Sequence, residues 1–192
     1  MQQLIKSEVR LWAERLTQNN PHFAGLPACP FAKKAIADDR VDVRMDFGWQ
    51  YCEVVRTAKH LPQRKSLIIQ AELNPQMSAE EMHADIRKMN MHLSQQNIWL
   101  IGFHPDDPDP DFDDDSEDFK SLVDEPFAMI FIQRLTELDD ASKVLEAQRY
   151  YTRASHEEIM ELYRRRQARE EYDNGNGKKA RSAGTWRKSQ SI

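Results

Sequence analysis

Four stretches of the chain have the hydrophobic pattern of β-strands. Residues 40–45 alternate valines with charged residues, which predicts a half-buried strand. Residues 66–73 give the clearest strand pattern in the first half of the chain. Residues 98–103 and 127–135 are almost uninterrupted apolar runs, which predict buried strands.

Apolar residues recur at helical spacing between these strands and at both ends of the chain. Residues 3–18 repeat Val9, Trp12 and Leu16 on one side of a helix, and Ser78 begins a capping box that opens another. The other expected helices are residues 30–37, 49–60, 139–150 and 156–172.

This order of elements predicts an α/β or α+β fold, a single layered domain over residues 1–172 with a mixed sheet of about four strands. Two strand–helix–strand crossovers should be right-handed and join parallel neighbours. A loop joins the last two strands, which could be antiparallel. Residues 173–192 are rich in Gly, Lys, Ser and Arg, which predicts a disordered basic tail.

Charge and composition narrow the class of protein. The 192 residues have a net charge of −5, and the last fifteen carry five cations and no acid, so the rest of the chain is strongly acidic. An acidic body argues against a nucleic-acid-binding core and leaves the tail open. The chain has no apolar run of membrane-spanning length and no secretory core, and its two cysteines are too few for a disulfide scaffold, so a cytoplasmic protein is expected.

Cys29 directly precedes Pro30 at the start of the expected helix 30–37. Proline suits the first position of a helix, where its missing N–H has no bond to lose. Cys29 would then lie at the N-cap, facing free amides and the positive end of the helix dipole. Such a setting lowers the pKa of a thiol and favours a nucleophile or a metal ligand. Cys52 lies inside an expected helix and lacks this setting.

His104 follows the expected strand 98–103 directly, and strand carboxyl ends are where sites form in open α/β sheets. With Cys29 it could make a nucleophile and its base, or two ligands of a transition metal. The structural alternative is a small buried thiol and a histidine that satisfies a loop carbonyl. The chain has no CxxC or HxxxH pattern typical of zinc sites.

Three sets of charged residues have a functional and a structural interpretation. Arg44 and Arg134, in or at the end of expected strands, could bind a substrate carboxylate or phosphate, or form salt bridges. The run 164–166 is basic but alternates with glutamates, which indicates a salt-bridged helix surface. Residues 106–118 hold nine carboxylates in thirteen positions, which indicates a solvated loop or lid. Their spacing resembles a calcium loop, but Phe112 occupies the glycine position that such a loop requires.

The order of several short motifs resembles a bacterial family known as domain of unknown function 1415. The shared motifs are Cys29-Pro30-Phe31-Ala32, Val43-Arg44, Phe103-His104-Pro105 before an acidic loop, and a strand from Pro126-Phe127 to Arg134. The likeness spans about residues 5–150, and the chain departs from it at Ala28, at 124–127 and at Leu135. The resemblance implies a shared site that includes Cys29 and His104 and does not name its chemistry.

These observations predict a small cytoplasmic enzyme that acts on a small anionic metabolite. Cys29 would be nucleophile, redox thiol or metal ligand, His104 its base or co-ligand, and Arg44 or Arg134 would orient the substrate. The alternative is a non-catalytic interaction module whose acidic body and basic tail bind partners, with a structural Cys-Pro loop.

Overall fold

The computed structural model describes the backbone of residues 2–19, 25–27, 29–46, 51–72, 77–107, 127–154 and 156–188. The side chains of residues 2, 5, 46, 51, 52, 72, 153 and 177–188 lie outside this description. The acidic loop that was predicted over 106–118 falls almost entirely outside the described residues.

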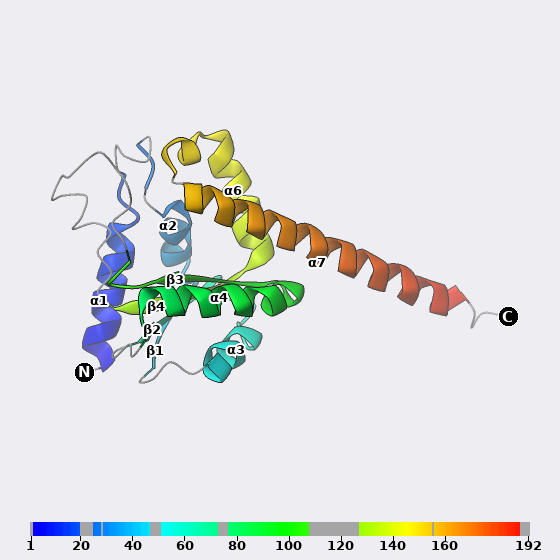
Figure 1. Ribbon diagram of the computed structural model, residues 1–192, viewed down its shortest axis with the longest axis horizontal. Coiled ribbons are helices and arrows are strands. Elements are labelled where there is room, and N and C mark those ends of the chain that lie inside the picture. Colours follow the sequence, from blue (N-terminus) through cyan, green and yellow to red (C-terminus); the bar gives the residue numbers. More distant parts are fainter. Residues whose placement is uncertain are drawn as a thin grey trace.

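A four-stranded mixed sheet forms the centre of the molecule (Figure 1). Its strands are β1 (Val41–Asp46), β2 (Leu67–Glu72), β3 (Ile98–Phe103) and β4 (Ala128–Arg134). They lie in the order β1-β2-β4-β3, with β1 and β2 parallel and β4 antiparallel to both of its neighbours. The sheet and its helices confirm the predicted layered domain, and the fold is α+β.

The position of β4 corrects one part of the predicted topology. β2 and β3 run in the same direction, but β4 lies between them, so they are not the parallel neighbours that a simple crossover would give. Residues 128–132 of β4 are all buried, whereas only the first half of β3 is, so the more apolar strand occupies the interior of the sheet.

Helices cover both faces of the sheet (Figure 1). On one face lie α1 (Gln2–Arg15), α2 (Pro30–Ala37), α6 (Leu135–Ala147) and α7 (His156–Lys188). On the other lie α3 (Tyr51–Lys59) and α4 (Ala79–Leu93), whose N-terminus has the predicted capping box. Two short 3₁₀ helices, η2 (Ser94–Gln96) and η3 (Tyr150–Arg153), follow α4 and α6.

Two helices differ in extent from the predicted ones. α6 begins at Leu135 rather than near residue 139, because Asn97 at the start of β3 accepts from both Leu135 N and Thr136 N. Its backbone carbonyl takes the first bond at 3.1 Å and its side-chain oxygen the second at 2.9 Å. α7 continues past Tyr172 to Lys188 and extends away from the body (Figure 1). The disorder predicted for the basic tail stays a prediction.

Gly102 allows α4 to pack closely on β3. A Cβ at this position would lie 2.5 Å from Ile86 Cδ1 and 2.8 Å from Met82 Cε, and both side chains are buried. We expect Gly102→Val to lower the free energy of unfolding by about 1–3 kcal/mol, because overpacking forces neighbours out of their rotamers. Gly102→Ala should cost less, since the two contacting atoms are ends of flexible side chains. Denaturant titration of the two variants measures both values, and equal stability of Gly102→Val and the parent chain would contradict the close packing.

Candidate functional site

Cys29 occupies the N-cap of α2, with Pro30 at the start of the helix, as the Cys-Pro sequence predicts. Its own N–H donates to the carbonyl of Leu16 at 2.8 Å, which ties the start of α2 to the end of α1. The thiol makes no capping hydrogen bond, and the residue is partly exposed while packing against the core beneath α1 and α2.

The electrostatic setting of Cys29 differs from the prediction. Burial raises the pKa of the Cys29 thiol, and this effect is larger than the opposing effect of the backbone amides of Ala32 and Phe31. The helix start therefore favours the thiolate as expected, but desolvation outweighs it. The resting form of Cys29 at neutral pH is the protonated thiol.

Two phenols of η3 lie near Cys29, and one of them is bonded by a residue of α7. Burial raises the pKa of Tyr150 and of Tyr151, and the nearby Cys29 raises both further. The two rings meet edge to face with centroids 5.0 Å apart. Arg165 of α7 donates a hydrogen bond to the Tyr151 phenol and opposes the rise of its pKa. We call Cys29, Tyr150, Tyr151 and Arg165 the thiol–phenol cluster.

Arg165 is the least expected member of this cluster. The run 164–166 was predicted as a salt-bridged surface, and Arg164 and Arg166 fit that prediction through Glu161 and Glu146. Arg165 is only 7% exposed, and its Nε has no hydrogen-bond partner among the described residues.

Sequence spacing offers a signal for the position of Arg165. The side chain lies three residues after Leu162, which is buried, and three before Ala168, which packs in the cluster around Trp99. This spacing places Arg165 on the side of α7 that faces the body. The run of three arginines at 164–166 indicates a solvent-exposed surface and draws attention away from this spacing of buried residues.

His104 is held by the residues that follow it. It is 2% exposed, its backbone N–H donates to Asp107 Oδ2 at 2.8 Å, and its Nδ1 accepts from the Asp106 N–H at 3.1 Å. The Asp107 carboxylate also contacts His83 Nε2 at 2.7 Å, which ties the start of the loop to α4. No described hydrogen bond or ion pair joins His104 to Cys29. The His104 ring bonds to a loop N–H rather than to the loop carbonyl of the structural alternative, and its Nε2 is buried without a partner among the described residues.

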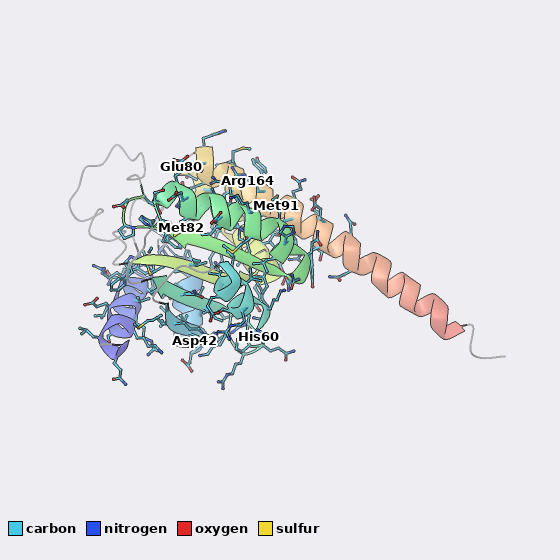
Figure 2. The ribbon with its side chains drawn as sticks, turned by 60° about the horizontal axis from the view of Figure 1, so that its bottom comes forward. Asp42, His60, Glu80, Met82, Met91 and Arg164 are labelled. Carbon is cyan, nitrogen blue, oxygen red and sulfur yellow. The ribbon has the colours of Figure 1, made fainter. Side chains whose placement is uncertain are left out.

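Arg44 lies on the opposite face of the sheet from α2. Val41 and Val43 of β1 face the core beneath α1 and α2, so the alternating Asp42 and Arg44 point the other way. Arg44 Nε contacts Asp42 Oδ2 at 3.1 Å, and both side chains are more than a third exposed. Figure 2 shows Asp42 in the lower part of the molecule and Arg164 of α7 in its upper part.

Arg134 lies at the opposite end of the sheet from His104. In the register of β3 and β4, Arg134 pairs with Ile98 and Met129 pairs with Phe103. Five residue steps separate the two ends, about 17 Å at roughly 3.3 Å per residue. Arg134 donates to the carbonyls of Lys65 and Pro62, so its guanidinium binds the turn before β2. The described contacts thus bring neither arginine to Cys29.

The described residues contain neither a metal-binding cluster nor a membrane-spanning helix. No group of three or more His, Cys, Asp or Glu side chains that could hold a metal ion occurs among them, so the transition-metal hypothesis for Cys29 and His104 has no further ligand there. Within the same residues, no helix combines the length and the apolar character that crossing a bilayer requires.

Comparisons with protein-family models, curated proteins and solved structures gave no match to this chain. The resemblance to domain of unknown function 1415 therefore stays a prediction that rests on its short motifs.

Proposed function

We propose that the protein is a small cytoplasmic enzyme that acts on a small anionic molecule at Cys29. The observation that carries the proposal is the thiol–phenol cluster, in which the half-buried residue Cys29 lies near two phenols and Arg165, a buried cation, bonds one of them. In this site Tyr150, Tyr151 and Arg165 take the roles that the sequence assigned to His104, Arg44 and Arg134.

The cluster supplies hydrogen-bond donors and a fixed positive charge. Phenols with a raised pKa stay protonated at neutral pH, and O–H groups held in place can stabilise an oxygen that gains charge during a reaction. Because the thiol is protonated at rest, a reaction at Cys29 begins with transfer of its proton. Glu158 lies near Tyr150 and contributes to raising the pKa of that phenol, so a carboxylate is also present at this end of the cluster.

Alkylation of Cys29 tests the proposal directly. In a Cys52→Ser background, iodoacetamide should modify Cys29 stoichiometrically in the folded protein. The rate should rise with pH to a midpoint above about 8.5, the usual thiol value, because only the thiolate reacts and burial disfavours it. Mass spectrometry across pH 7 to about 10.5 measures the profile.

The same protein unfolded in urea provides the reference profile, and Cys29→Ser in the same background provides the blank. A folded protein that stays unlabelled where the unfolded chain reacts would overturn the proposal, because the sulfur would then be closed to any substrate. That outcome would favour the interaction-module alternative.

A further inference from the structure

Arg165 is a buried cation without a matching anion among the described residues. Its neighbours on α7 all contact carboxylates: Arg164 bonds Glu161, Arg166 bonds Glu146, and Arg169 bonds Asp140 and Asp173. Arg165 is more buried than any of these three, yet it forms no described ion pair. A guanidinium that has lost its water without gaining an anion is destabilising, so this position needs an explanation.

The surroundings of Arg165 add positive potential. Phe31, in the first turn of α2, packs against the same cluster around Trp99 as Ala168 and Tyr172 of α7, so the start of α2 and the helix that carries Arg165 share this part of the core. That first turn contains no acidic residue, and its free amides carry the positive end of the helix dipole. The indole N–H of Trp99, in the same cluster as Ala168, is another buried donor without a described acceptor.

Tyr151 is the only polar partner of Arg165 among the described residues. Tyr151 accepts from Arg165, lies near Cys29 and is itself partly exposed, so one partner of the buried guanidinium lies at the surface. A phenol that accepts one hydrogen bond keeps its own O–H free to donate. A ligand oxygen placed beside Tyr151 would thus meet a donor, a fixed cation and the start of α2.

We propose that Arg165 and Tyr151 form a binding site for a small oxyanion, the carboxylate or phosphate group of the substrate that is presented to Cys29. This inference rests on the proposed function, because it names the chemical class of the ligand at the same site. The guanidinium binds such a group through paired N–H donors, and the Tyr151 phenol donates a further bond.

Inorganic phosphate and acetate are suitable probes of the empty protein. At constant ionic strength set with chloride, we expect at least one of them to raise the Tm of the parent chain in a saturable way. Binding of phosphate alone assigns a phosphate group, and binding of acetate alone assigns a carboxylate. Arg165→Met should weaken the binding about tenfold or more, the low end of what a hydrogen bond to a charged group contributes.

Arg164→Gln is the matched control, since Arg164 is adjacent, 44% exposed and paired with Glu161. It should leave the anion response unchanged. If Arg165→Met does not fold, Tyr151→Phe removes the donor and should weaken binding while leaving Arg165 in place. Saturation by neither anion, or equal binding by the parent chain and the folded variants, overturns the inference.

A second measurement separates this inference from the proposed function. In the Cys52→Ser background, the ratio of the iodoacetate rate to the iodoacetamide rate at Cys29 reports attraction of an anionic reagent. It should fall in Arg165→Met and not in Arg164→Gln. A reactive Cys29 with the same ratio in all proteins keeps the proposed function and removes the anion site. If phosphate or acetate binds in an Arg165-dependent way while Cys29 does not react, the anion site is kept and the proposed function is removed.

Discussion

Replacing Asn90 by leucine is expected to lower the free energy of unfolding by about 3 kcal/mol, since two buried backbone groups would lose their partner at roughly 1–3 kcal/mol each. β3 is an edge strand, so part of its backbone faces away from β4. Asn90 of α4 replaces the missing strand there. Its amide nitrogen donates to Leu100 O at 2.9 Å and its oxygen accepts from Leu100 N at 2.8 Å.

The measurement is the Tm, which should fall by about 6–12 °C for a chain of this size. Leucine has the branching of asparagine and is larger in volume, so it leaves no cavity, and the loss would report the two hydrogen bonds together with any overpacking. Met91→Ala, at the adjacent and 65% exposed position of α4, is the control and should change the Tm little. If the Tm of Asn90→Leu lies within 2 °C of the parent value, the free energy of unfolding has changed by about 1 kcal/mol or less. That result would show that water or another group bonds to the N–H and carbonyl of Leu100.

Local sequence signals predicted the elements more accurately than their arrangement. The Cys29-Pro30 pair marks the start of α2, and the apolar run 98–103 matches β3 at both ends, because each depends on residues adjacent in the chain. The position of β4 between β2 and β3, and the bonds of Asn97 to the start of α6, depend on residues more than twenty-five positions apart. Periodicity carries no information about such pairings.

The candidate site shows the same division between local and distant effects. The N-cap position of Cys29 follows from the adjacent Pro30. The burial that raises the pKa of the Cys29 thiol depends on tertiary packing instead. The phenols near Cys29 lie in η3, more than a hundred residues away along the chain. Arg44 and Arg134 looked equivalent because both lie on strands. In the structure, Arg44 lies on the face of the sheet opposite Cys29. Arg134 lies at the end of the sheet opposite His104.

Trp12 joins α1 to the sheet, and its loss should have the largest effect of any substitution considered for this chain. The side chain is 1% exposed and meets two rings edge to face, Phe103 of β3 with centroids 5.8 Å apart and Phe131 of β4 at 5.9 Å. Trp12→Ala would remove these contacts and leave a cavity, so we expect a loss of roughly 3–5 kcal/mol. The Tm should fall by about 10 °C or more.

Trp12→Phe should cost much less, because it keeps an aromatic ring and removes an indole N–H that is buried without a described partner. Leu11→Ala, at the neighbouring 60% exposed position, should leave the Tm nearly unchanged. Since Leu16 of the segment after α1 accepts the hydrogen bond from Cys29 N, loosening α1 also releases the start of α2. Cys29 in Trp12→Ala should therefore react faster with iodoacetamide below the Tm, which links the packing of α1 to the thiol site. An unchanged alkylation rate alongside a lowered Tm would show that α2 holds Cys29 in place without α1.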